Sequence, residues 1–499
     1  MRAVRGGHSG CGVDVARGNG GCRDQAAAAS GEAGATPTLK PLPSPPPPPV
    51  ELRAYRVLVA LGFGDGPRVP KGLPNRLTLE LRRQIDTRVG PLWEADVTEV
   101  PWLQPGSRRL LNDMTEADLN ARFLPTDYDK VFLATVETEG GGYRISAREW
   151  DRNSQTSTAV TSRSEYESRV LGDRLFAEVY THFRPLAEVE TVSEDGKTIG
   201  MVVRGGELLP ADPAAAPAEV GAYLAPYYRY YDRKKELRQL QMLEWTYLHV
   251  TGVERARVTA QLISTFQNPL AGSRRRVDLM AITLKPRFEG TELTVYPRGQ
   301  PDNPVAGLRI DVTDREPTAE DKVEDRLVLY TGRQGAVMIP VNAGTPLQYL
   351  YILSGKSVLA EIPYIAGNAP TARLEVPDDG PRLGVEGEVE ILEAELIELV
   401  ARREVAMARA LGLAKGKDWE AADRLVEEIK QLPTRESMLE RVERMRLQAV
   451  DAARRTNNRV GEIRINKLCK TLVEHIERHL NPDRVRGFLQ EYRVLKDVG

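Results

Sequence analysis

Strand-like sequence stops at Pro381, and this change of pattern limits what the chain can fold into more than any other feature does. Before it, short runs of β-branched and aromatic residues recur between turn residues, as they do in β-sheets. After it, apolar residues recur every three or four positions over long segments, as they do in amphipathic helices. The two patterns need separate cores, so a chain of 499 residues is expected to form several domains, roughly three by length alone.

Residues 1–50 differ from the rest because they are rich in Gly and Ala and then in Pro, ending in PSPPPPP at 43–49. This composition cannot bury enough apolar surface to offset chain entropy, so we predict a disordered leader with an extended polyproline II end. A spacer is the favoured interpretation, and a ligand for a proline-binding module is the alternative.

Residues 51–186 have the element order of an α/β domain. The run YRVLVALGF at 55–63 is apolar on both faces, which is typical of a central strand covered by helices. Thr115 and Asp118 are spaced as a capping box, which indicates two short helices within 107–123. The other predicted elements are a helix capped by Asn75 and stopped at Gly90, strands at 93–100, 128–136 and 143–150, and a helix at 165–183.

Two β-rich segments and a helical tail follow. Residues 187–275 are predicted to form a small β-barrel or sheet, with strands at 198–203, 223–231, 243–250 and 257–264. Residues 276–382 are predicted to form an Ig-like β-sandwich, with strands at 293–296, 308–312, 327–330, 337–341, 347–353 and 358–362.

Residues 383–499 are predicted to form an α-helical bundle of four or five antiparallel helices. A long helix covers 386–411, with acidic residues first and arginines last, as the helix dipole favours. Asp418, Thr434 and Asn481 stand where they can begin further helices. The predicted fold class is therefore multi-domain α+β.

Composition excludes several classes of protein. The 69 basic and 71 acidic residues give a net charge of -2, which argues against a nucleic-acid-binding protein. No apolar run reaches the length of a transmembrane helix, and residues 1–20 lack the apolar core of a secretory signal. Cys11, Cys22 and Cys469 are too few for a disulfide framework or a four-ligand metal site, so they do not define the compartment.

The segment from Gly62 to Gly66 is the candidate cofactor-binding loop, because glycines after a strand let phosphate approach backbone amides. The spacing departs from the dinucleotide fingerprint, whose third glycine would fall at Pro67, and no Gly-Lys-Ser/Thr follows. A plain flexible loop is favoured, with nucleotide or small-ligand binding as the alternative.

His475 and His479 lie four residues apart on a predicted helix, a spacing that allows two imidazoles on one metal ion. The metalloprotease pattern requires Glu after the first His, where this chain has Ile476, so surface histidines are favoured and no metal is predicted.

The tyrosine-rich run at 223–231 leads into Arg233-Lys234-Lys235, a combination that can stack on single-stranded nucleic acid. A tyrosine-rich strand ending in a charged hairpin turn is favoured instead, and no nucleic acid is expected as a partner. The chain has no Gly-x-Ser-x-Gly elbow, no Cys/His pair in a motif and no conspicuous acidic pair. We therefore predict no catalytic residues and no cofactor.

Two stretches resemble known domain families. The hairpin formed by DKVFL at 129–133, GYRISAR at 142–148 and residues 151–156 resembles the amino-terminal α/β domain of TolB and curli-secretion-type envelope proteins, over about 55–185. The segments PVAGLRIDV at 304–312 and TGRQGAV at 331–337 resemble a CnaB or carboxypeptidase-regulatory-like sandwich, with the usual Asp replaced. The whole arrangement resembles a family of planctomycete-type bacteria, a resemblance that implies no activity.

The resemblances imply a periplasmic or envelope location, and a cytoplasmic one is the alternative. We expect a non-enzymatic interaction or scaffold protein that binds other proteins through its sheet edges and helix faces. The competing hypothesis is an enzyme or ligand-binding protein that uses the loop from Gly62 to Gly66. The sequence leaves the partner, the reaction and the oligomeric state open.

Overall fold

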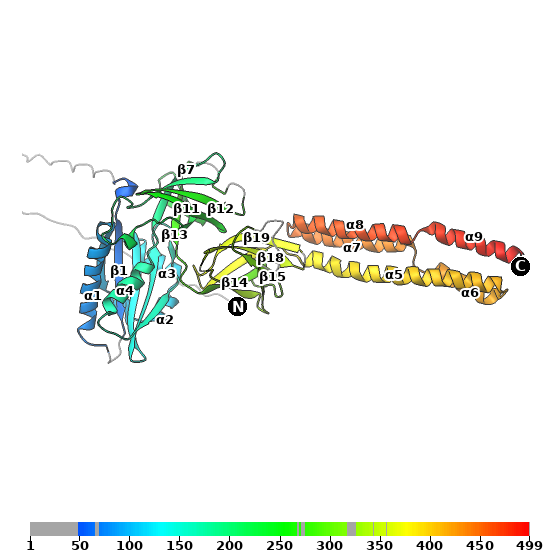
Figure 1. The fold of residues 1–499 in the computed structure, drawn as a ribbon, viewed down its shortest axis with the longest axis horizontal. Helices are drawn as coiled ribbons and strands as arrows, with labels where there is room; N and C mark the ends of the chain where they lie inside the picture. The colour runs from blue at the N-terminus through cyan, green and yellow to red at the C-terminus, as the bar shows by residue number, and fades with distance from the viewer. Residues whose placement is uncertain are drawn as a thin grey trace, which may run out of the picture. The chain divides into compact units, whose positions relative to one another are not determined.

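The computed structural model describes residues 48–64, 69–266, 269–270, 275–316, 326–342, 344–355 and 357–498. Nearly all of the predicted leader, including Cys11 and Cys22, lies outside these ranges. The predicted multi-domain α+β fold class is confirmed (Figure 1). No helix in the described ranges is both long and apolar enough to span a membrane.

The first unit is a six-stranded sheet of order β2-β1-β3-β4-β5, with β6 also paired to β4. Strand β1 is parallel to both β2 and β3, and β3 and β4 form an antiparallel hairpin. The strands are β1 Tyr55–Phe63, β2 Trp93–Glu99, β3 Lys130–Glu139, β4 Gly142–Asp151, β5 Thr156–Ser157 and β6 Thr161–Glu165.

Both faces of this sheet are covered, as the apolar run in β1 predicted. Alternate residues such as Val57 and Val59 join one core with α1 (Leu73–Gln84) and α4 (Leu171–Thr181). The intervening Leu58 and Ala60 join a second core with α2 (Arg108–Asp113) and α3 (Glu116–Phe123). The side chains therefore alternate between two cores, since the period of a strand is two.

Local sequence patterns predicted some ends of these helices correctly and others wrongly. The capping box of Thr115 and Asp118 is present and separates α3 from α2, as predicted. The prediction of Asn75 as a cap is wrong, because Pro74 permits the helix to begin earlier, after Gly72. The predicted helix at 165–183 is too long at its start, because β6 runs to Glu165 and α4 begins at Leu171.

The second unit is a closed β-barrel. Of the two alternatives predicted for this segment, a small barrel or a sheet, the barrel is therefore the correct one. Strands β9-β11-β12-β8-β7-β13 pair in this order, and a further pairing between β13 and β9 closes the ring, while β10 pairs only with β9. Strand β13 lies beyond residue 275, where the sequence placed a domain boundary. The strands are β7 Leu186–Val192, β8 Thr198–Val203, β9 Tyr223–Tyr231, β10 Leu237–Met242, β11 Thr246–Glu254, β12 Arg257–Ser264 and β13 Val277–Leu284.

The third unit consists of two sheets, β17-β14-β20 and β16-β15-β18-β19. Both contribute to one apolar core, which contains Leu293 from the first sheet and Ile310 and Leu350 from the second, as a β-sandwich requires. The strands are β14 Gly290–Pro297, β15 Arg309–Thr313, β16 Leu327–Tyr330, β17 Ala336–Pro340, β18 Leu347–Ser354, β19 Ser357–Ile365 and β20 Thr371–Val376.

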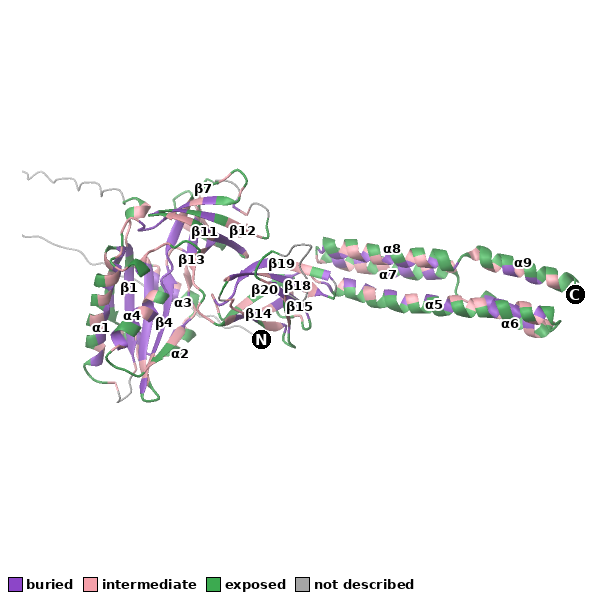
Figure 2. Cartoon of the chain, viewed as in Figure 1, coloured by how far each residue is buried: buried purple, intermediate pink, exposed green. Residues whose placement is uncertain are grey.

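The carboxy-terminal unit is helical. The helices are α5 Gly380–Lys415, α6 Trp419–Gln431, α7 Arg435–Arg455, α8 Arg459–His479 and α9 Pro482–Val498. The first part of α5 shares a core with α7 and α8, and its last part shares another with α6 and α9. Figure 2 shows buried and exposed residues alternating along these helices. The side chains of Asp418 and Thr434 cap α6 and α7, as predicted.

The direction of α8 differs from the expected antiparallel arrangement. Asn458, just before α8, donates to the carbonyl of Asp378, just before α5, and His475 further along α8 contacts Glu393 on α5. Residue numbers therefore rise together along the two helices. The two helices are therefore parallel. Helices α6 and α7 both return along α5, which leaves α8 to run in the same direction as α5 again.

Candidate functional site

The start of the predicted glycine loop is used for packing. A Cβ on Gly62 would lie 2.4 Å from the carbonyl oxygen of Leu103, so only glycine allows this approach of two backbones. The amide of Gly64 donates to the carbonyl of Val136 at 3.0 Å. The rest of the loop, including Gly66 and Pro67, lies outside the described residues.

An open hollow of about 460 Å³ lies near this loop, at the carboxyl end of β3. Three arginines line it, but Arg109 pairs with Asp113 at 3.6 Å and Arg144 pairs with Glu139. The side chain of Arg109 is 90% exposed, so the hollow provides little shielding from water. These features weaken any attraction for a phosphate group.

The predicted histidine pair lines a groove between α5 and α8, with a volume of about 430 Å³. The Nδ1 atom of His475 lies 3.6 Å from a carboxylate oxygen of Glu393, whereas His479 is exposed. The described residues contain no group of three or more His, Cys, Asp or Glu side chains placed to hold a metal ion.

The groove is apolar along its α5 side. Leu396, Ile397, Val400 and Ala401 line it, and Ile397 is 71% exposed. Polar groups border this strip, with Glu393 on α5 and Arg478 on α8. The structure thus leaves an apolar strip with a polar rim between two parallel helices.

The tyrosine-rich strand belongs to the barrel. Tyr227 is fully buried, and the hydroxyl of Tyr228 donates to the carbonyl of Pro269 at 3.0 Å. Tyr230 donates to Gln241 on the neighbouring strand β10. The basic residues after it form an exposed hairpin turn, which Asp232 organises by accepting bonds from the amides of the turn. The tyrosines therefore contribute mainly to the barrel rather than to an open aromatic platform.

A buried charge cluster is the feature that the sequence did not reveal. Lys130, Glu149 and Asp151 have fully buried side chains, and the ammonium of Lys130 donates to both carboxylates, at 2.5 and 2.8 Å. Arg184 adds a contact to Glu149 at 3.3 Å, and Ser154 donates to Asp151 through its amide and its hydroxyl. Substrate cannot reach these groups, so we regard the cluster as structural.

Strand register explains how this cluster forms. Lys130 on β3 is paired directly with Asp151 on β4, and Glu149 lies two residues earlier on the same face. Burial opposes ionisation of Asp151, but the charges of Lys130 and Arg184 outweigh it and hold the pKa of this carboxyl below its ordinary value. The two carboxylates two residues apart in strand β4 were the one signal in the sequence.

His182 lies in an adjoining hydrogen-bonded site. Its Nδ1 and Nε2 atoms lie 2.8 and 2.7 Å from the hydroxyls of Thr158 and Thr161. Burial and the nearby Arg287 hold the pKa of His182 well below its ordinary value, so the ring is neutral at pH 7. With both nitrogens occupied, the ring is not available as a catalytic base.

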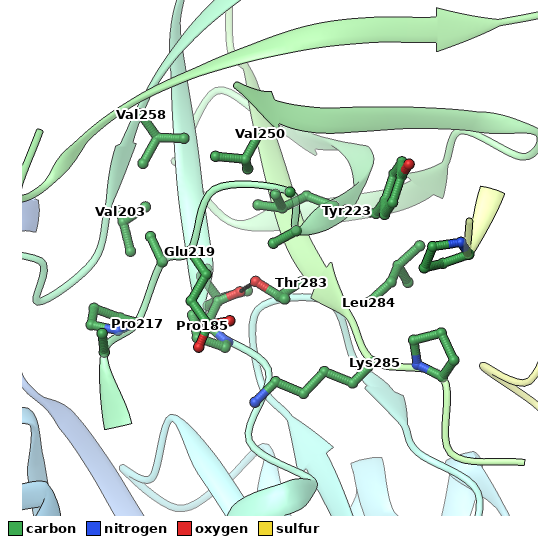
Figure 3. Close-up of a pocket in the computed structure, with 18 of the residues that line it drawn as sticks. Pro185, Val203, Pro217, Glu219, Tyr223, Val250, Val258, Thr283, Leu284 and Lys285 are labelled. Carbon is green, nitrogen blue, oxygen red and sulfur yellow. Dashed lines mark hydrogen bonds between the residues drawn. The ribbon is translucent and has the colours of Figure 1, made fainter. Parts of the chain in front are cut away.

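The barrel has a cavity of about 350 Å³ at one end. Figure 3 shows Val203, Val250 and Val258, from β8, β11 and β12, on one side of it, and Glu219 and Lys285 on the other. Lys285 follows β13 directly, while Glu219 belongs to the connection between β8 and β9. The cavity is therefore apolar at one side and charged at the other.

Lys285 is the unusual group in this cavity. Its ammonium lies 5.5 Å from the centre of the Tyr180 ring, and it forms no hydrogen bond or ion pair with the described residues. Burial, followed by the charge of Arg287, lowers the pKa of Lys285 to about 8. The hydroxyl of Thr283 is already used, since it donates to the carbonyl of Pro185 at 3.1 Å.

Comparison with known proteins gives distant matches in structure alone. No protein-family model and no curated protein matches the sequence. The crystal structure of TolB from Acinetobacter baumannii matches 63% of this chain and 83% of its own, with 10% identity and a TM-score of 0.17. The Bacillus anthracis TIE protein matches 44% of this chain and 46% of its own, with 10% identity and a TM-score of 0.13. At these scores the matches assign neither a family nor a function.

Proposed function

We propose that this chain is a non-enzymatic interaction protein, and that its helical region, residues 380–498, binds another protein. The groove between α5 and α8 is the observation that carries the proposal. Ile397 is 71% exposed on α5, beside Val400 and Ala401, and a side chain of this size gains free energy when a partner removes it from water.

The partner expected in this groove is an amphipathic helix of another protein. Two parallel helices form the walls, the floor is apolar, and the rim carries an acidic residue, Glu393, on one side and a basic one, Arg478, on the other. A helix that places its apolar face in such a groove can pair its own charged residues with both rims.

The buried polar groups support a role without catalysis. Lys130, Glu149, Asp151 and Arg184 neutralise one another in the interior, and His182 is bonded through both ring nitrogens. These groups stabilise the fold where the α/β unit meets the barrel, and their side chains are already used in contacts within the protein. Association with the bacterial cell envelope is part of the proposal, on the resemblance of residues 55–185 to TolB-type domains.

Photo-crosslinking from position 397 tests the proposal. A photoreactive amino acid replaces Ile397 in the full chain, and Leu79 on α1, which is 65% exposed, serves as the matched control position. We expect discrete protein adducts from position 397 that are absent from position 79 and are lost when Val400→Glu is added. Identical adducts from both positions, or none from position 397, would contradict the proposal.

A further inference from the structure

We propose that the barrel cavity binds a small apolar molecule with a single carboxylate, whose carboxylate pairs with Lys285 and whose apolar body lies against Val203, Val250 and Val258. This site is separate from the groove between α5 and α8 and does not depend on the function proposed for it.

The size and lining of the cavity fit a small ligand. Its volume of about 350 Å³ falls within the range of small-molecule sites, which are mostly apolar and contain few polar groups. The valines come from three different strands of a closed barrel, so paired backbone holds them in place. An apolar body bound there would lose its contact with water without requiring the barrel to open.

The charge at the other side selects for an anion. Lys285 is half-buried and has no carboxylate partner within ion-pair distance in the described structure. The guanidinium of Arg287 adds positive charge nearby, but two of its nitrogens already donate to the carbonyl of Thr181. A ligand carboxylate would supply the partner that Lys285 lacks, and a ligand ammonium would be repelled by both cations.

Glu219 is not the carboxylate partner of Lys285. It lines the cavity, but it forms no ion pair with Lys285 in the described structure, and its side chain is exposed at the rim. Water can therefore continue to solvate Glu219 when a ligand carboxylate pairs with Lys285. Glu219 also disfavours a dianionic ligand, because a second carboxylate would lie near its own negative charge.

The pH dependence of binding follows from the protonation of Lys285. The charged or titratable groups that act on its ammonium are Arg287, Glu149, Glu219, Lys130 and Tyr180. The pKa of Lys285, about 8, means that the amine is mostly charged at pH 7 and mostly neutral at pH 9. A carboxylate binds only the charged form well, so affinity should fall by up to about tenfold from pH 7 to pH 9.

Isothermal titration of the full chain with octanoate, octan-1-ol and octylamine tests the inference. We expect saturable binding of one octanoate, at least tenfold weaker binding of octylamine, and intermediate binding of octan-1-ol. Lys285→Met should weaken octanoate about tenfold and leave octan-1-ol unchanged. Lys285→Arg should retain octanoate, and Lys234→Met, in the exposed turn after β9, should change nothing.

A second variant separates binding from folding. Val250→Trp fills the apolar side of the cavity and should abolish binding of both octanoate and octan-1-ol, while circular dichroism verifies that the barrel remains folded. The inference is overturned if octanoate does not bind, if octan-1-ol binds as tightly as octanoate, or if Lys285→Met leaves octanoate affinity unchanged.

Discussion

Replacing Lys130 by Met should destabilise the protein strongly, because it leaves two carboxylates in the interior without their main cation. Glu149 and Asp151 are both fully buried, and Arg184 reaches only Glu149, at 3.3 Å. Removing one partner from a buried ion pair costs about 3–5 kcal/mol. For a cooperative unit of 150–250 residues this corresponds to a fall in Tm of roughly 6–20 °C.

Urea unfolding followed by tryptophan fluorescence measures this loss, since Trp93, Trp102 and Trp150 lie in the α/β unit. Lys197→Met, at an exposed position, is the matched control and should unfold like the unmodified chain. A second control is the variant that also carries Glu149→Gln and Asp151→Asn, which removes the uncompensated charges and should recover part of the stability.

Lowering the pH gives an independent test of the same cluster. The pKa of Asp151 is below its ordinary value in the folded chain, so its contribution to stability is present at neutral pH and is lost as the pH falls below about 4. Protonation also relieves the unpaired charge in Lys130→Met, so the difference between this variant and the unmodified chain should shrink between pH 7 and pH 4. If Lys130→Met unfolds within 1 kcal/mol of its control at pH 7, the account of the cluster is refuted.

Two other features give predictions of the same kind. The guanidinium of Arg382 joins Asp379 and Glu386 and donates to the carbonyl of Ser354 at 3.1 Å. Arg382→Met removes these contacts, so deuterium exchange should rise around residues 378–386. Arg424→Met, at an exposed position, is the control and should leave this exchange unchanged. Gly62→Ala should lower the free energy of unfolding in urea by about 1–3 kcal/mol, because its Cβ would meet Leu103. Gly387→Ala, whose Cβ would lie in open space, is the control and should not lower it. Thermal-shift assays with nucleotides should show no stabilisation, and a concentration-dependent shift would restore the nucleotide-binding alternative.

Local sequence signals predicted most individual elements. The nine-residue run of β1 is apolar on both faces because helices cover both sides of its sheet. The caps at Thr115, Asp418 and Thr434 involve residues only three positions away, so the neighbouring sequence specifies them. In the barrel and the sandwich, strands β7, β10, β13 and β20 were missed. Strands β10 and β20 contain many exposed polar residues, so their sequences lack the apolar pattern of a strand.

What the sequence determined by itself was therefore the type and order of the units, through hydrophobic period and capping, which act over a few residues. Tertiary structure alone decided where β13 pairs, how Lys130 meets Glu149 and Asp151, and where Lys285 faces the barrel cavity. These outcomes depend on strand register and ring closure between segments far apart in the chain. A charged residue in a strand looks the same in the sequence whether its side chain faces water or a buried partner. Only the pairing of strands in the folded chain distinguishes these two environments.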